Sequence, residues 1–140
     1  MKKFFSLTGA VIAVIALITI SCEKTPEELL IGKWEVQSVH IQGYANNVLL
    51  LDSIATYDPG DMQLEFFEGG TGKEYENYEL NDNFTWVVNG DKVTVTVSGS
   101  DPMEFPFTVG EKAMSYTMTE EWTEGEDNFK IEMIFHLKRL

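Results

Sequence analysis

Apolar and polar residues alternate in short runs along most of the chain. In the last run, residues 129–137, every odd position is apolar, and the positions between are charged or polar except Ile134. Because successive side chains of a β-strand point to opposite faces, this alternation predicts strands with one buried and one solvated face. The pattern predicts eight strands, near residues 33–41, 62–67, 71–78, 84–88, 92–98, 103–109, 113–122 and 129–137.

The segments between these strands are rich in glycine, asparagine, aspartate and proline. Asn89-Gly90 indicates a tight hairpin, because these two residue types tolerate the positive φ that such turns require. The turns join strands that are adjacent in sequence, which favours up-and-down order. Eight strands that each have one apolar face can bury these faces by closing into a barrel, which also removes open sheet edges. We therefore expect an all-β fold, an eight-stranded up-and-down antiparallel barrel, with a two-sheet β-sandwich as the alternative.

One segment, residues 43–61, does not fit this pattern because it is too long for a hairpin connection. Long loops in compact domains are often functional or lid-like. Residues 48–51 (VLLL), together with Ile54, are apolar enough to form a short helix or an extra strand over one mouth of the barrel. A buried plug with no role in ligand binding is the alternative.

The N-terminal segment is typical of a secretory leader. Met1-Lys2-Lys3 is positively charged, and residues 7–20 form an uncharged apolar stretch that ends at Ser21-Cys22. This stretch is shorter than the about 20 residues that cross a bilayer as a helix, which favours cleavage over anchoring. We therefore assign residues 1–21 to a signal-peptide helix that precedes the fold.

The mature chain is expected to begin at Cys22, the only cysteine of the sequence. We assign residues 22–30 to a tether and residues 31–140 to the barrel domain. Thr25 and Pro26 could also open one helical turn inside the tether, as N-cap and first helical residue.

The chain is strongly acidic. Its formal net charge is −13, and removing the two lysines of the leader leaves 8 basic against 23 acidic side chains, a charge of −15. Nucleic acid binding and anionic lipid surfaces both require basic residues. We therefore expect no nucleic acid partner, and attachment to a membrane only through a lipid.

No catalytic or metal-binding motif stands out. His40 and His136 lack carboxylates at ligand or triad spacing, and we interpret them as surface histidines. The acidic run at residues 120–127 lacks the ligand order of a calcium loop and is interpreted as a solvated turn, with weak cation binding as a minor alternative. We expect no enzyme activity, no catalytic residue, no metal and no cofactor.

Two short motifs carry a family resemblance. Thr19-Ile20-Ser21-Cys22 resembles the lipobox of bacterial lipoproteins, and Gly32-Lys33-Trp34 resembles the Gly-x-Trp that opens lipocalins. Together with the strand pattern and a late Arg139, they make the chain similar to the short lipocalin-like lipoproteins of Bacteroides-type bacteria.

The resemblance implies two sites and a location. Cys22 would carry a diacylglycerol that anchors the protein in the envelope of a Gram-negative bacterium, which we expect to be the outer membrane. Gly32, Trp34 and Arg139 would form the barrel floor, with the basic side chain packed across the tryptophan. Asp52-Ser53-Ile54 also resembles the short O-glycosylation sequon of envelope proteins from these bacteria.

An aromatic set could line a ligand pocket, because such pockets are apolar with few polar groups; core packing explains the same residues without a ligand. The candidate lining residues are Phe66, Trp86, Phe105, Phe107, Tyr116 and Phe129. We expect a lipid-anchored binding module for a small apolar ligand or an envelope protein. The alternative is a protein-interaction or inhibitor lipoprotein that acts through its acidic surface.

Overall fold

The computed structural model describes residues 23–140. The predicted signal peptide and the predicted lipid site at Cys22 lie outside these residues. Within the described part, no helix is long and apolar enough to cross a membrane.

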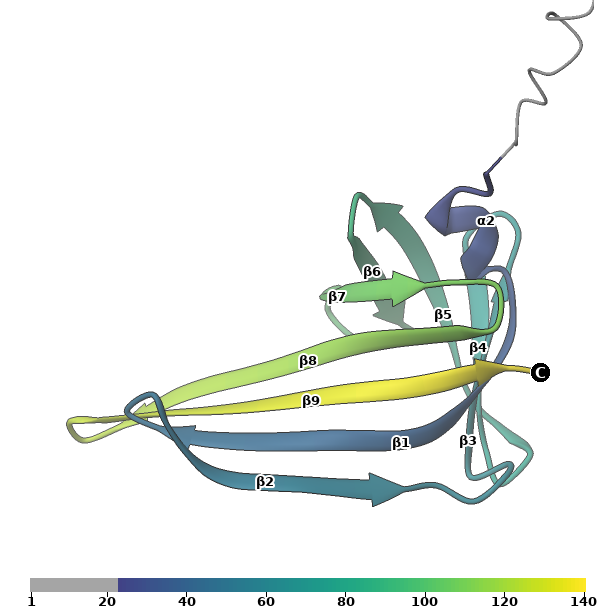
Figure 1. Cartoon of the computed structure of the whole chain (residues 1–140). Coiled ribbons are helices and arrows are strands. Elements are labelled where there is room, and N and C mark those ends of the chain that lie inside the picture. Colours follow the sequence, from purple (N-terminus) through teal and green to yellow (C-terminus); the bar gives the residue numbers. More distant parts are fainter. Residues whose placement is uncertain (1–22) are drawn as a thin grey trace, which may run out of the picture.

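In residues 23–140, one short helix is followed by nine antiparallel strands (Figure 1). The elements are α2 (Pro26–Leu30), β1 (Gly32–Ala45), β2 (Val48–Thr56), β3 (Met62–Phe67), β4 (Thr71–Glu76), β5 (Glu79–Asn89), β6 (Lys92–Val97), β7 (Met103–Val109), β8 (Ala113–Glu124) and β9 (Asp127–Arg139). Strands β3 to β8 each pair with the next along the chain, and pairing of β1 with both β3 and β9 closes the barrel. The expected eight-stranded barrel is confirmed, and the β-sandwich alternative is wrong because the first and last strands pair.

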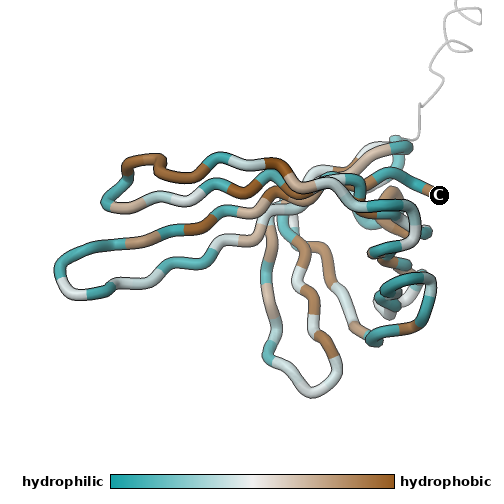
Figure 2. Tube along the Cα trace, turned by 90° about the horizontal axis from the view of Figure 1, so that it is seen from below, coloured by the Kyte–Doolittle hydropathy of each residue, from teal (hydrophilic) through white to brown (hydrophobic). Residues whose placement is uncertain are grey.

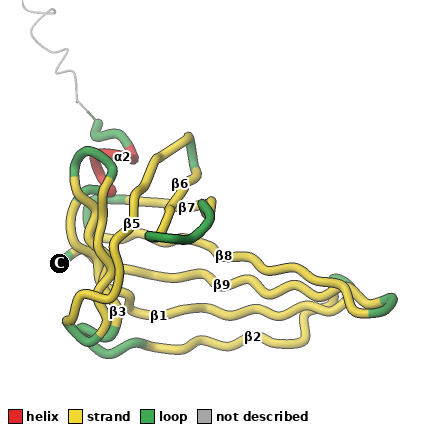
Figure 3. The backbone as a smooth tube through the Cα atoms, turned by 180° about the vertical axis from the view of Figure 1, so that it is seen from behind, coloured by secondary structure: helices red, strands yellow, loops and turns green. Residues whose placement is uncertain are grey.

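The barrel is longer on one side than on the other. Strand β1 pairs with β3 only over Gly32–Glu35, and from Ser38 onward it pairs with the extra strand β2. The outer parts of β1, β2, β8 and β9 project from the barrel as a four-stranded sheet, which we call the arm (residues 40–54 and 119–132; Figure 3).

Strand β2 occupies the segment that did not fit the alternating pattern. Asn46 and Asn47 turn the chain with φ values of 49° and 65°, which asparagine tolerates, and β2 then returns along β1. An extra strand is thus formed, but it lies at the sheet edge and all nine of its residues are exposed. The buried-plug interpretation is wrong. Figure 2 shows the apolar stretch of β2 near the end of the arm.

Helix α2 closes one end of the barrel. Thr25 caps it, with a capping box to Glu28 and Pro26 in the first turn, as the local sequence favours. Leu30 is completely buried, and its carbonyl accepts a hydrogen bond from Trp34 Nε1 at 2.8 Å. The packed domain therefore includes α2 and begins before Ile31, so only the first part of the expected tether precedes the fold.

Candidate functional site

The three residues predicted to form the barrel floor lie together at the closed end. Arg139 Cζ lies 4.2 Å from the centroid of the Trp34 ring, which is fully buried. A Cβ placed on Gly32 would come within 2.4 Å of Arg139 Nη1, and Gly32 has φ of +133°. Glycine thus leaves the space that the guanidinium fills.

Arg139 also ties three chain segments together through its hydrogen bonds. Its Nη1 donates to the Ile31 carbonyl at 2.8 Å, its Nε donates to the Glu111 carbonyl at 2.6 Å, and its Nη2 donates to the Leu29 carbonyl. These contacts join the end of α2 and the turn between β7 and β8 to the last strand. The floor is therefore a structural closure of the barrel.

A buried carboxylate beside the floor was not foreseen from the sequence. Glu35 is 3 % exposed and accepts hydrogen bonds from the Gly60 amide at 3.0 Å and from Gln63 Nε2 at 2.9 Å. Lys138 Nζ lies 3.4 Å from its other oxygen. The Gln63 hydrogen bond, helped by Gly60 and Lys138, holds the pKa of Glu35 below its usual range, against the opposing effect of burial. Every acceptor oxygen is used, so this group is part of the framework.

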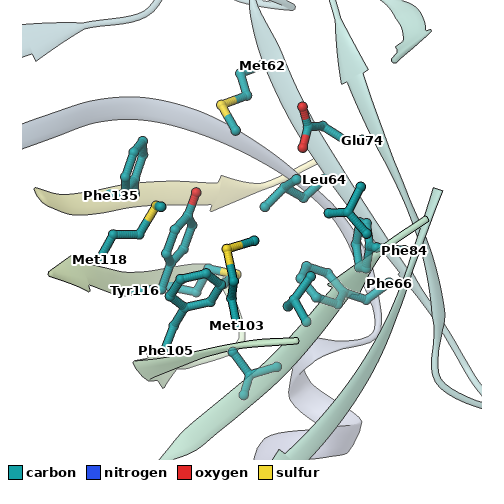
Figure 4. A pocket seen from close by; sticks show the side chains of 14 residues that line it. Met62, Leu64, Phe66, Glu74, Phe84, Met103, Phe105, Tyr116, Met118 and Phe135 are labelled. Carbon is teal, nitrogen blue, oxygen red and sulfur yellow. The ribbon is translucent and has the colours of Figure 1, made fainter. Parts of the chain in front are cut away.

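The barrel interior contains a pocket of about 230 Å³ (Figure 4). This is slightly smaller than the about 300–1,000 Å³ of common small-molecule sites. Seven barrel strands, β3 to β9, contribute to its wall. The lining residues are Met62, Leu64, Phe66, Glu74, Phe84, Val93, Val95, Val97, Met103, Phe105, Met114, Tyr116, Met118 and Phe135.

Aromatic rings form the firm part of this wall. Tyr116 stacks on Phe135 with ring centroids 4.7 Å apart, and Phe105 lies 5.8 Å from Tyr116. Phe66 meets Phe84 edge-on at 5.3 Å. Four methionines complete the wall, and their unbranched side chains adapt readily to irregular shapes. The pocket can therefore adjust to a bound molecule without moving its strands.

Three of the six predicted lining residues, Phe66, Phe105 and Tyr116, face this pocket. Trp86 and Phe107 are instead buried outside it; the Trp86 indole donates to the Thr71 carbonyl at 2.8 Å. Phe129 lies on the arm, stacked on Trp122 at 5.4 Å. Alternation assigns a side chain to the inner face but does not say at which level of the barrel it lies, which explains these differences.

Two polar groups enter the otherwise apolar pocket: the carboxylate of Glu74 and the hydroxyl of Tyr116. Glu74 was not predicted as a site residue. Nothing in the sequence distinguishes it from a solvated residue. In the structure it shares the inner face of β4 with Gly72, whose Cβ position would lie 2.2 Å from the Phe84 ring. Burial, and then the charges of Glu74 and Tyr57, raise the pKa of Tyr116, so Tyr116 keeps its proton.

The two histidines lie away from the pocket. His40 Nε2 is 2.5 Å from Asp52 Oδ1 across β1 and β2, and His136 is exposed on β9. Among residues 23–140, no group of three or more histidine, cysteine, aspartate or glutamate side chains is placed to hold a metal ion.

The fold and the pocket together define a closed antiparallel barrel with an apolar interior site. The family model of the lipocalin-like domain matches residues 30–131, and the chain belongs to this family. Comparisons with curated proteins and with solved structures gave no match.

Proposed function

We propose that this protein binds a small apolar molecule inside its barrel. The observation that carries the proposal is the interior pocket, in which Glu74 is the one charged residue among fourteen lining residues. Burial of apolar surface contributes roughly 25 cal/mol per Å², and a preformed apolar pocket gains this without reorganising. The proposed role is binding rather than catalysis, and it requires no metal or cofactor.

The second part of the proposal concerns the membrane. A diacylglycerol on Cys22 would hold the protein in the envelope of a Gram-negative bacterium, in its outer membrane. Each buried methylene adds about 0.8 kcal/mol, so two or more acyl chains anchor firmly. Because α2 follows closely after Cys22 and closes one end of the barrel, such an anchor would keep the floor, rather than the tip of the arm, close to the attachment point.

A pocket-filling substitution tests the ligand proposal. Val95 lines the pocket, and Val95→Trp would occupy much of the space in it. Val87→Trp is the matched control, because Val87 is 66 % exposed on β5. Titration calorimetry with phenethyl alcohol, a small neutral apolar probe, should show binding to the native chain and to the control. Binding to Val95→Trp should be at least about tenfold weaker, a loss of about 1.4 kcal/mol.

Native mass spectrometry gives an independent reading. The protein purified from its host without detergent should retain a small molecule that Val95→Trp lacks. Equal binding of phenethyl alcohol to the native chain and to Val95→Trp, or no binding to either, would contradict the interior site.

A further inference from the structure

The pocket carries a carboxylate where its barrel otherwise places apolar side chains. Glu74 pairs across the sheet with Leu64, and directly paired residues share a face, so both point inward. Asn81 Nδ2 donates to Glu74 Oε1 at 2.9 Å. A carboxylate offers about four acceptor positions, and no other group among residues 23–140 donates to this one. Glu74 is partly exposed and lines the pocket, so its remaining acceptor positions are available to a bound molecule.

The hydroxyl of Tyr116 is the second open polar group. Among residues 23–140 it neither donates nor accepts a hydrogen bond, although the residue is only 9 % exposed. Figure 4 shows this hydroxyl and the Glu74 carboxylate directed toward the same end of the pocket, the end at which Met62 lies. Phe66 and Phe105 lie toward the opposite end, which is apolar. The pocket thus has one polar end and one apolar end.

The polar end has a definite charge preference. Where a carboxylate borders an apolar cavity, a cationic donor forms a stronger hydrogen bond with it than a neutral donor does. A second carboxylate placed there would be repelled. The acidic surface of the whole chain, with its net charge of −13, raises the local concentration of cations in the same sense.

We infer that the pocket selects small apolar amines in their protonated form over the corresponding alcohols and carboxylates. The ammonium donates to Glu74 and to the Tyr116 oxygen, and the apolar body lies among the aromatic and methionine side chains. This inference rests on the proposed function, because it assumes that the pocket is the binding site.

Three matched probes separate charge from apolar contact: phenethylamine, phenethyl alcohol and phenylacetate. Calorimetry at neutral pH on the full chain should show the amine binding about tenfold more tightly than the alcohol, and the carboxylate more weakly than the alcohol. Glu74→Gln keeps the shape but removes the charge. It should reduce the affinity for the amine about tenfold and leave that for the alcohol unchanged.

Two further variants serve as controls. Glu76→Gln removes an exposed carboxylate from the same strand and should retain the preference for the amine. Tyr116→Phe deletes only the hydroxyl. It should reduce the affinity for the amine about threefold without changing the affinity for the alcohol, and it also tests the polar end if Glu74→Gln does not fold. General attraction to the acidic surface would instead disappear at high salt in all variants alike.

The outcomes distinguish this inference from the proposed function. The amine selectivity is wrong if the native chain binds amine and alcohol with equal affinity, or if the preference for the amine survives in Glu74→Gln. In either case, binding of the alcohol would still support the interior site. If none of the three probes binds the native chain, both the selectivity and the interior site are wrong.

Discussion

Arg139, the second-last residue, lies over Trp34 at the start of the first strand, with Cζ 4.2 Å from the ring centroid. The two residues also pair in register between β1 and β9. The contact therefore lies where the barrel closes, and it joins the two ends of the described fold. A guanidinium is suited to this position because it can stack on a ring while donating several hydrogen bonds from one plane.

Replacing Arg139 should destabilise the barrel. Arg139→Ala removes the stacking contact and leaves three backbone carbonyls without their donor, so we expect a loss of at least about 2 kcal/mol in the free energy of unfolding. Arg139→Lys should recover only part of it, since an ammonium cannot reproduce the planar set of donors. Urea unfolding followed by tryptophan fluorescence measures both.

The exposed Lys112→Ala is the control for Arg139, and its change should stay within about 0.5 kcal/mol. If Arg139→Ala unfolded at the same urea concentration as the native chain, the closure of the barrel would not depend on this contact.

The buried carboxylate of Glu35 should make stability depend on pH in the acid range. Its pKa in the folded chain is lowered from an ordinary value of 4.5, chiefly by the Gln63 hydrogen bond. A group with a lowered folded pKa stabilises the fold above its unfolded pKa, and this contribution is lost as pH falls through the folded pKa. Native protein should therefore lose stability below about pH 4.5. Glu35→Gln should be less stable at neutral pH, but its stability should fall less as the pH is lowered below 4.5.

Glu104→Gln is the control for Glu35. Glu104 forms an exposed ion pair with Lys92 at 3.3 Å, and exposed pairs contribute little, so this variant should follow the native pH profile. Thermal unfolding by circular dichroism between pH 3 and pH 7 makes the comparison. A Glu35→Gln profile parallel to that of the native chain would contradict the role given to the buried carboxylate.

Side-chain alternation was sufficient to predict the barrel but not the arm. Residues 129–133 alternate as clearly as residues 135–137, yet Phe135 and Leu137 are buried while the earlier ones are only partly buried. A local pattern says which face of a strand is apolar; it does not say where along the strand the opposite wall of the barrel ends. For the same reason the apolar residues 48–51 gave no sign that they would lie exposed on an edge strand.

The candidate site was predictable only in part. Tyr116 could be assigned to the inner face by parity, and it does line the pocket. Glu74 could not, because a charged residue inside a short polar strand is indistinguishable from a solvated one until the partner strand is known. The floor was predictable because Gly32, Trp34 and Arg139 match a motif of the family that the sequence resembles; in the structure, the missing Cβ of Gly32 and the stacking of Arg139 on Trp34 explain why these three residues lie together.

The tip of the arm should depend on Asn46. Its side chain donates to Asp127 Oδ1 at 2.8 Å and accepts from the Asn128 amide at 2.9 Å, so it links the two hairpins of the arm. Asn46→Ala also places alanine at a φ of 49°, a conformation that costs roughly 1 kcal/mol or more. Hydrogen exchange should accelerate in β2 and at the outer ends of β8 and β9, while exchange in β3 to β6 stays unchanged. Uniform acceleration throughout the barrel would show that the arm is not an independent unit.

Cys22→Ala tests the proposed anchor, which rests on the sequence of the leader. Without the thiol no diacylglycerol can be attached, so we expect unprocessed precursor of higher mass and loss of the acylated form after labelling with a radioactive fatty acid. Ser21→Ala keeps a small residue before the cysteine and should process normally. Because the contacts described for α2 and the barrel lie among residues 23–140, the circular dichroism of the variant should retain its β-sheet signal. Normal maturation of Cys22→Ala would show that the chain is exported by a route that needs no lipid on this residue.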